Sequence, residues 1–559
     1  MFYLAVIPMV YCGGINSVPV SSHHPIYQFL QRLENKGIIE FRAAVKPLSR
    51  GEIYELLAEA RTKSASEEFS GLFTALDRRL ITRYYLEFGS GGKSDKDTEL
   101  TENHDTKLAE FREKYWASAP FYRDGTNFYS LNVNDFTINC NPIVKYNFVT
   151  DSTGEMIMRR ISGVNLNASL SSYMGLYFDF RDNLEKGRGP YNYGDREKLY
   201  CDNAGFVDMK GENHTYYELA QAALSYSRKN LFLLFGRMQF CIGSGRDSHL
   251  ILSDNPPPFD CFYLRYDIGE IARFTYLTGI LHAYPEIYKI ETSGYNGGQR
   301  KISENKFIAV HRIEVYPTKN IEIGLTESVI YGQRGLEPAY LNPINLYYSA
   351  EHNLGDLDNV NWEADMEVNL PYGVNIYGEF LIDDMRTGEL GTDYWGNKFA
   401  YIGGIDWADP VGVPNTDFNI EYSRIKPFVY THFYEINVYK NWNSCLGHYL
   451  PPNSDQWLMR LQWRPFYTIS TNISAVFIRH GANPDSVTNA GGDIDTPPVS
   501  GYEGSAPFLD GLRINSAVYE AGIKWEPLEY YSLSGEIRYH KWSTGDQWEW
   551  ELTCGVSFW

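Results

Sequence analysis

The sequence has no long apolar run beyond its first residues. Its 559 residues have a mean hydropathy of -0.38, and 21% of them are charged. A transmembrane helix needs about 20 consecutive apolar residues, and about 18 is the shortest run that would indicate one. This absence excludes a helical membrane protein. The length also exceeds that of one ordinary soluble domain.

Basic residues are fewer than acidic ones. The chain has 50 Lys and Arg against 70 Asp and Glu, which gives a formal net charge of -20. Such a balance provides no broad basic surface for nucleic acid or for polyanionic glycans. We therefore predict no nucleic-acid partner. Binding of any polyanion would depend on local arginine clusters or bridging cations.

Cysteines are few and widely spaced. The chain has seven, and removal of Cys12 with a signal peptide would leave six in an oxidising compartment. Their spacing is not that of a compact disulfide framework. Cys241 and Cys261 form the one pair to test for a bridge. Cys554 lies on the apolar face of the last strand and is expected to be a small hydrophobic residue that faces lipid.

Motifs of common catalytic and metal sites are also missing. The sequence contains no GxSxG, which disfavours a serine hydrolase of the α/β-hydrolase kind, although an outer-membrane phospholipase would use a different barrel. The 12 histidines show no metal-ligand spacing, so we predict no metal and no cofactor. GSGRDSH, residues 243–249, lacks the Lys-Ser/Thr of a phosphate-binding loop. Its glycines are expected to permit a tight turn.

Acidic residues offer one possible catalytic arrangement. Asp254, Asp260 and the acidic pair at 383–384 are candidates for paired glycosidase acids. The alternative is structural, with Asp254 and Asn255 forming a turn before Pro256. The carboxylates would then accept hydrogen bonds from loop amides or from an inward-facing arginine. We favour the structural interpretation.

Aromatic residues, in contrast, are abundant. They make up 15% of the chain, with 44 Tyr and 12 Trp. Rings form girdles at the two interfaces of a membrane barrel and also line sugar-binding surfaces. A soluble β-propeller or sandwich would show a similar composition. The pattern along the chain must therefore separate these classes.

The stretch from Ile313 to Tyr331 shows the repeating unit of the chain. It contains two runs joined by a turn at Pro317, and apolar residues alternate with polar or small ones in the second run. A period of two gives a strand with one apolar and one polar face. Glu327 is the one misfit, because it is charged at an apolar position.

This unit recurs with a proline turn at Pro371, Pro465 and Pro527. Between these tight turns lie long segments rich in Gly, Asn, Asp and Pro, such as 383–397 and 481–508. Short turns at one end and long loops at the other are typical of an outer-membrane barrel, whose short turns are periplasmic. We therefore predict that all four proline turns lie on the periplasmic side.

The clearest strand signal is residues 164–180, which we interpret as one strand. Even positions, such as Val164 and Phe180, would face lipid, and odd positions, such as Asn165 and Asp179, would face the lumen. The last strand, 550–558, ends in an aromatic residue, as barrels inserted into Gram-negative outer membranes do. Trp559 is left over, one residue beyond the usual end.

These patterns predict a mostly β chain with four parts. Residues 1–17 are read as a signal peptide without a basic start, and Tyr11 disfavours a lipoprotein alternative at Cys12. Residues 18–90 form a small periplasmic α-helical bundle, and 91–115 form a charged linker. Residues 116–559 form a large transmembrane antiparallel β-barrel. Its length suits about 16–20 strands, with about 18 as the central value.

The bundle is predicted to contain three short amphipathic helices. The first begins at Pro25, and the second begins with a capping box made by Ser49 and Glu52. The third is expected to run from about Ser66 through Leu80. We interpret the bundle as a stabilising cap, while docking of a partner or plugging of the barrel remain alternatives.

The segment from Arg334 to Tyr348 is the most unusual loop. It is rich in apolar residues, and Pro338 and Pro343 prevent regular strand pairing. We predict that it folds inward and closes the pore, with its backbone partners supplied by residues such as Glu337 and Asn342. The alternative is an external flap packed on neighbouring loops.

Several motifs spread over most of the chain point to one family. They are GRxxxxxGxG and LILSDNxPPFD within 236–260, RIEVYPTKNIEIGLTESVIYG, LxPAYLNP, and the N-terminal KPLSRGEI. With them the chain resembles the Wzi-like capsule-assembly outer-membrane proteins. The family usually has aromatic-Gly-Pro-Gly where this chain has 241–245. The resemblance implies a large occluded barrel with a periplasmic bundle and lectin-like, non-enzymatic behaviour.

Three functions follow as hypotheses. The first is a non-catalytic factor that assists capsule or surface-polysaccharide assembly and attachment in the outer membrane. The alternatives are a porin or channel and an outer-membrane barrel enzyme. Expected partners are surface polysaccharide, outer-membrane lipid, and polysaccharide-export or periplasmic proteins that contact the bundle. Candidate polysaccharide-binding or lumen-plug residues are Arg246, Asp254, Asn255, Asp260, Arg334, Glu337, Tyr340 and Asn342.

Overall fold

A computed structural model describes most of the chain. The described residues are 17–42, 44–89, 127–133, 136–187, 207–208, 214–283, 288–292, 299–485, 488–499, 504–528, 530–543 and 545–557. The predicted linker, nearly all of the predicted signal peptide, Cys12, Cys201 and Trp559 lie outside them, as does the predicted barrel start at Trp116.

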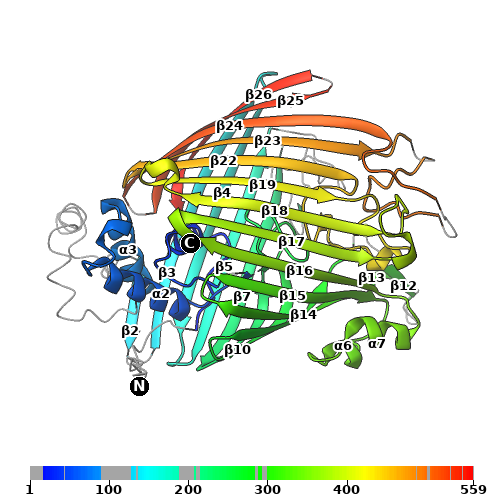
Figure 1. Cartoon of the computed structure of the whole chain (residues 1–559), viewed down its shortest axis with the longest axis horizontal. Helices are drawn as coiled ribbons and strands as arrows, with labels where there is room; N and C mark the ends of the chain where they lie inside the picture. The colour runs from blue at the N-terminus through cyan, green and yellow to red at the C-terminus, as the bar shows by residue number, and fades with distance from the viewer. Residues whose placement is uncertain are drawn as a thin grey trace.

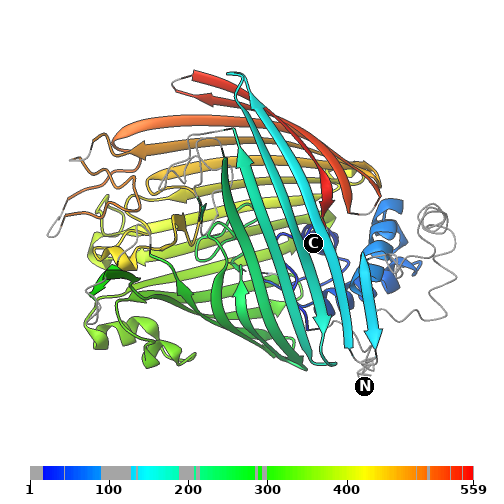
Figure 2. The ribbon, with the colours of Figure 1, turned by 180° about the vertical axis from the view of Figure 1, so that it is seen from behind.

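Within the described residues, 18 antiparallel strands close into a barrel (Figures 1 and 2). The ring closes where the last strand pairs with the first, from Glu549 opposite Asp151 to Ser557 opposite Ile143. This confirms the predicted fold class and the central strand number. The ring consists of β3 (Phe136–Asp151), β4 (Met156–Ser169), β5 (Met174–Lys186), β7 (His214–Arg228), β8 (Leu231–Met238), β10 (Phe259–Ile268), β11 (Ala272–Leu281), β14 (Lys306–Thr318), β15 (Ile321–Gly332), β16 (Asn359–Leu370), β17 (Val374–Asp384), β18 (Lys398–Ala408), β19 (Thr416–Ile425), β22 (Ser454–Phe466), β23 (Ile469–Ala482), β24 (Leu512–Leu528), β25 (Tyr531–Trp542) and β26 (Gly545–Ser557).

Short strands add to this ring or pair beside it. β2 (Tyr129–Val133) pairs with β3, and β6 (Val207–Asp208) pairs with β7. The remaining short strands form three two-stranded sheets. They are β1 (Val45–Lys46) with β9 (Cys241–Ile242), β12 (Tyr288–Thr292) with β13 (Gln299–Ser303), and β20 (Lys440–Asn441) with β21 (Ser444–Cys445).

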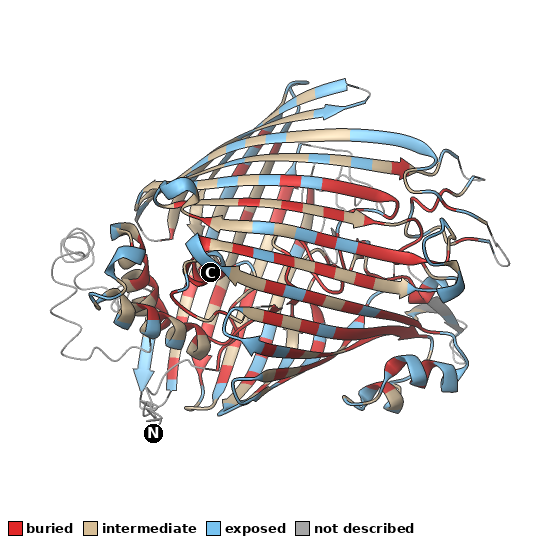
Figure 3. Ribbon diagram, viewed as in Figure 1, coloured by how far each residue is buried: buried red, intermediate tan, exposed pale blue. Residues whose placement is uncertain are grey.

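Alternation of side chains separates the lumen from the outer wall. In β16, Asn361, Glu363 and Asp365 are buried inside the barrel, whereas Trp362 and Met366 are exposed on the outside. Figure 3 shows the same alternation of buried and exposed bands along the wall. The inward face is polar and the outward face is apolar, which is the arrangement that a lipid-facing barrel requires.

Residues 164–180 form a hairpin, so the prediction of one continuous strand is wrong. β4 ends at Ser169, which lies opposite Gly175 in β5. The hydroxyl of Ser171 accepts hydrogen bonds from the backbone N–H groups of Tyr173 and Met174 and stabilises the turn. Paired residues such as Ser169 and Gly175 are an even number of positions apart, so odd positions of both strands face the lumen and even positions face outward, as predicted.

The four proline turns lie at the same end of the barrel as the helices, here called the short-turn end (Figure 1). Pro317, Pro465 and Pro527 each lie at a register shift near the end of a strand. Proline cannot donate to a strand ladder and is tolerated at such bulges. Pro371 begins the short 3-10 turn η3 (Pro371–Gly373). Placement of this end in the periplasm stays a prediction.

The bundle contains α1 (Ile26–Asn35), α2 (Arg50–Ser64) and α3 (Ala75–Phe88), with η1 (Ser70–Leu72) before α3. The capping box of Ser49 and Glu52 is confirmed. The predicted start of the third helix is wrong, because Thr74 and Asp77 form a second capping box that starts α3 at Ala75. None of the described helices is both long and apolar enough to cross a membrane.

Ion pairs hold the bundle against the barrel. Arg32 of α1 lies 3.1 Å from Asp77 of α3, 2.6 Å from Asp409 and 2.7 Å from Asp417. Lys36 bridges Asp77 and Asp409 at 2.8 and 2.9 Å. Burial raises the pKa of Asp77, but Arg32 and Lys36 outweigh it and hold that pKa below its usual value. The bundle is therefore a charged cap joined to the short-turn end.

The prediction that 334–348 plugs the pore is wrong. This segment contains α6 (Pro338–Leu341) and the first residues of α7 (Tyr347–Leu354), and it lies outside the barrel beside β14 (Figures 1 and 2). We call residues 333–358 the outer flap. Its buried Tyr340 and Tyr347 pack on the outward side of the wall, with Phe307, Val329 and Tyr331. The outward face of the barrel wall is apolar, so it can bury the apolar side chains of this segment as well as a position inside the lumen could.

Candidate functional site: the occluded lumen

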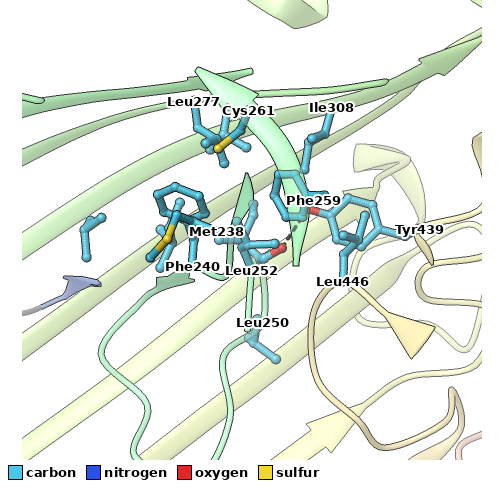
Figure 4. Close-up of a cluster of buried hydrophobic side chains, with 14 of the residues drawn as sticks. Met238, Phe240, Leu250, Leu252, Phe259, Cys261, Leu277, Ile308, Tyr439 and Leu446 are labelled. Carbon is cyan, nitrogen blue, oxygen red and sulfur yellow. Dashed lines mark hydrogen bonds between the residues drawn. The ribbon is translucent and has the colours of Figure 1, made fainter. Parts of the chain in front are cut away.

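Two other segments fill the lumen. The first lumen segment is 239–258, between β8 and β10, and the second lumen segment is 426–453, between β19 and β22. Phe240, Leu250 and Leu252 of the first segment belong to one buried cluster with Phe259 and Leu277 of the wall (Figure 4). All five side chains are buried. The interior therefore has an apolar core of its own.

The second lumen segment is hydrogen-bonded to the first. The hydroxyls of Tyr430 and Tyr439 donate to the backbone carbonyls of Leu250 and Ile251, each at 2.7 Å. The two tyrosine rings are stacked with their centroids 5.4 Å apart. Asn255 donates from its side-chain amide to the carbonyl of Cys445 at 2.8 Å. The carbonyls of the first segment thus find partners that substitute for water.

Glu379 of β17 is the main acceptor for the first lumen segment. Its carboxylate accepts from the backbone N–H of Gly245 at 2.6 Å and of Leu250 at 2.7 Å. The ring of His249 lies 3.1 Å from the same carboxylate. Gly243 adopts a φ of +131° beside Glu379, and an added Cβ there would collide with that carboxylate. The tight turn expected from these glycines is therefore present, and its backbone surrounds the carboxylate of Glu379.

Arg246 is the predicted site residue that the structure places most centrally. Its guanidinium lies 2.7 Å from Glu367 of β16 and 3.1 Å from Asp406 of β18. It also lies 4.5 Å from the ring centroid of Tyr377 in β17. One side chain thus ties the first lumen segment to three strands of the wall. The adjacent Asp247 pairs with Arg460 at 2.8 Å.

The candidate acids do not gather at one place. Asp254 lies on the first lumen segment, 3.4 Å from His23 of the bundle. Asp260 points outward from β10 and pairs with Arg237 at 2.6 Å, where both side chains are exposed. Asp383 accepts from the backbone N–H of Tyr430 at 2.5 Å. These contacts favour the structural interpretation of the carboxylates over paired glycosidase acids.

The cysteine pair selected for a test is not bridged. Cys241 and Cys261 are both free and buried inside the barrel. Cys554 shares the outward side of β26 with the exposed Trp550 and Leu552, as expected. Within the described part of the chain, no group of three or more His, Cys, Asp or Glu is arranged to hold a metal ion.

The remaining predicted site residues lie in the outer flap. Arg334 donates to Asp358 at 2.9 Å, and the hydroxyl of Tyr340 donates to the same carboxylate at 2.7 Å. Glu337 caps α6 by accepting from the backbone of Ala339. Asn342 is exposed at the end of α6. These residues hold the flap together and do not reach the lumen.

A polar cavity of about 290 Å³ lies where the bundle meets the lumen. Gln28 and Asn35 of α1 line it from one side, and Arg246, Asn419 and Arg460 line it from the other. The bundle also reaches the first lumen segment directly, because β1 pairs with β9. The short-turn end is thus closed by the helices and by the segment that they contact.

An aromatic cluster lies at the opposite end, here called the long-loop end. The ring of Trp395 lies 6.0 Å from those of Phe428 and Phe433, and Tyr394 lies beside it at 5.7 Å. Arg386 lies 4.6 Å from the ring centroid of Tyr394. The sequence analysis missed this cluster, because its members come from two loops about 40 residues apart. Aromatic residues inside these two long loops were the one pattern that could have indicated it.

Fold and site together define a class: an outer-membrane β-barrel with a helical cap and an occluded lumen. A family model described as "Capsule assembly protein Wzi" matches residues 122–551, which is most of the chain. The chain belongs to this family, and it is an outer-membrane protein.

Solved structures show the same fold. The chain aligns with Wzi, an outer-membrane protein of Escherichia coli, at 13% identity and a TM-score of 0.55, covering 97% of this chain and 99% of that one. The outer-membrane protein OprD of Pseudomonas aeruginosa aligns at 11% identity and a TM-score of 0.42, covering 75% and 92%. No curated protein matches the sequence significantly.

Proposed function

We propose that this protein is a non-catalytic, lectin-like factor that assists assembly and attachment of capsular or other surface polysaccharide. The printed description of the E. coli structure calls that protein a carbohydrate-binding β-barrel involved in group 1 capsule assembly. Family membership makes the same role the best hypothesis for this chain. The acids that the sequence offered as catalytic candidates are held in separate contacts, which supports a non-catalytic role.

The occluded lumen is the observation that carries this proposal. A passive porin needs an open lumen lined by charge. Here the charged wall residues Glu379, Glu367 and Asp406 are engaged by the first lumen segment. The outer flap, which was our first reason to disfavour a channel, plays no part in this closure. Purified protein in planar bilayers is expected not to conduct, and porin-like conductance would favour the channel alternative.

The aromatic cluster at the long-loop end is the best candidate surface for glycan. Phe433 and Tyr434 are each 51% exposed there, and Trp395 supports Phe433 in an edge-to-face contact. Apolar faces of sugar rings stack on such side chains, while Arg386 supplies charge for acidic sugars. The negative net charge of the chain makes such a local arrangement necessary.

Glycan-array binding by purified protein tests this surface. Phe433→Ala and Tyr434→Ala are expected to reduce binding of the recognised glycan at least tenfold. Tyr372→Ala is the matched control, since Tyr372 is 93% exposed at the short-turn end. Equal binding by all three variants would place recognition elsewhere. The same variants, tested for capsule retention on cells, connect binding to attachment.

A periplasmic partner is the second part of the proposal. The bundle binds the barrel through α1 and through Glu52 near the start of α2, which pairs with Arg265 at 2.6 Å. Later side chains of α2, such as Glu55 and Glu59, are exposed. That helix is the available face for a polysaccharide-export or periplasmic protein. Cross-linking from Glu55, an exposed position of α2, is expected to capture such a protein. Capture of barrel peptides alone would assign the bundle a purely stabilising role.

A further inference from the structure

The outer flap has an apolar outer surface. Ile344 is 84% exposed, and Leu336, Leu346 and Tyr348 are 55%, 47% and 51% exposed. Figure 3 shows exposed segments along both flap helices. Tyr340 is fully buried against the wall, so the flap carries apolar side chains on both of its sides. A soluble loop with a polar outer face would not have this composition.

The wall under the flap carries a polar pair on its outward face. His311 of β14 and Glu327 of β15 lie opposite each other, with 2.9 Å between Nε2 and Oε2. Glu327 also accepts from the backbone N–H groups of Tyr347 at 2.9 Å and Tyr348 at 2.7 Å. It thereby caps α7. Lipid could not satisfy these groups, so the flap is part of the wall at this level.

Strand register gives the depth of the flap. The apolar band of a membrane barrel is about 25 Å tall, and a strand tilted by about 40° rises about 2.5 Å per residue along the membrane normal, so about ten residues cross the band. Counted from Ile321 at the short-turn end of β15, this crossing ends near Ile330. Glu327, Val329 and Tyr331, which contact the flap, lie in or just beyond the outer third of this crossing. The exposed Trp362, opposite Glu327, suits the interfacial girdle there.

We infer that the outer flap is an interfacial element whose surface, formed by Leu336, Ile344, Leu346 and Tyr348, inserts among the hydrocarbon chains of the outer leaflet. The surface continues the lipid-facing wall, where Leu325 is exposed next to the flap. A helix with its first amide groups satisfied by protein can enter this region, because none of those groups needs water.

This placement gives the flap a mechanical role. It widens the apolar perimeter of the barrel on the side formed by β14, β15 and β16, with one hydrogen bond from Tyr276 of β11 to the carbonyl of Tyr340. Lipid contact on one side fixes the depth and tilt of the barrel. The glycan-facing loops at the same end are thereby held at a constant height above the lipid. The inference rests on outer-membrane location and on the predicted orientation, and it is independent of glycan binding.

A spin label on the flap tests the inference in the full-length protein. Ile344→Cys is made in a background whose native cysteines are replaced by alanine, labelled with a nitroxide and reconstituted into dioleoylphosphatidylcholine vesicles. Because Ile344 is so exposed, its replacement leaves the fold intact. Val499→Cys is the control, since Val499 is 77% exposed in the loop between β23 and β24.

The label at 344 is expected to collide with oxygen more often than with a water-soluble nickel chelate, and the label at 499 is expected to show the reverse. Equal nickel accessibility at both positions would overturn the inference. Strong dipolar broadening at 344 that disappears on dilution with unlabelled protein would also overturn it, in favour of a second copy of the chain as the occupant. Leu336→Cys provides a second position with the same expectation.

Discussion

Replacement of Arg246 by methionine tests whether the first lumen segment closes the pore. The substitution keeps an unbranched stem of similar length but removes the guanidinium that binds Glu367 and Asp406. Both carboxylates would remain in the lumen without their cation. The segment would keep its contacts with Glu379 and its apolar core, so the barrel itself is expected to fold.

The magnitude follows from the burial of this network. Arg246, Glu367 and Asp406 have side chains that are 17%, 9% and 17% exposed. Breaking a buried ion pair by removing one partner costs about 3–5 kcal/mol. At about 1.4 kcal/mol per factor of ten, the ratio of closed to open segment falls roughly 100- to 4,000-fold.

Single-channel recording in planar bilayers measures this change. Wild-type protein is expected to stay closed, and Arg246→Met is expected to show openings whose total time is larger by that factor. Arg237→Met is the control, because Arg237 pairs with Asp260 at an exposed position, where an ion pair contributes about 1 kcal/mol or less. The triple variant Arg246→Met, Glu367→Gln, Asp406→Asn removes the stranded charges and should recover most of the closure. Identical recordings for Arg246→Met and Arg237→Met would refute the reasoning.

Four further predictions concern the cap, the flap and the orientation. Lys319→Cys, in a background without native cysteines, is expected to resist an impermeant thiol reagent on intact cells, while Val499→Cys is labelled; labelling of position 319 would reverse the orientation. Deletion of residues 18–89 is expected to leave a membrane-inserted barrel, since every strand of the ring pairs without the cap. A shift in gel mobility between heated and unheated samples would show the folded barrel, and loss of insertion would make the cap part of the barrel fold. Deletion of 333–347 is expected not to open the pore, contrary to the plug hypothesis, and a conducting deletion variant would restore that hypothesis. Burial lowers the pKa of His24 below 6.5 despite the hydrogen bond to Glu87. The folded cap therefore has its full stability above pH 6.5 and loses stability as the pH drops below that value. Thermal melting of His24→Gln should lack this part of the pH dependence.

The sequence alone could predict the barrel because its information is local. Alternation with a period of two assigns each residue to the lumen or the lipid, and chain length sets the strand number. The hairpin at 169–175 was missed since its turn contains serine in place of Gly or Pro and keeps the alternation in phase. The capping box of Ser49 and Glu52 was found for the same local reason, as its two residues are three positions apart.

The lumen site could be predicted only in part. Arg246 was identified as a candidate, but its partners Glu367 and Asp406 lie more than 100 residues away in the chain. Glu379 is 134 residues from Gly245, whose N–H it accepts. No pattern of neighbouring residues in the sequence shows which inward-facing acid binds which loop. The alternation of Asn375, Tyr377 and Glu379 does show that β17 carries an inward polar row, and this was the usable signal.

The charged Glu327 at an apolar position of the strand was the feature of the sequence that could have predicted the location of the flap. An apolar loop must be covered, but a lumen and a lipid-facing wall both provide cover, so composition cannot choose between them. A carboxylate on an outward position can be buried only if protein reaches that side of the wall. The flap does so with the backbone of Tyr347 and Tyr348. Glu327 therefore indicated where the loop packs, but we interpreted it only as an irregularity of the strand.

The way in which the lumen is closed supports a role at the surface over one in transport. The first lumen segment leaves the wall at β8 and returns at β10, yet its anchors Glu367, Glu379 and Asp406 are on β16, β17 and β18. It thus connects separate parts of the ring, and the second lumen segment is bonded to it from the other side. Opening a path for a polymer would break all of these contacts together. A chain of sugars is therefore expected to be held at the long-loop end and not to pass through the barrel.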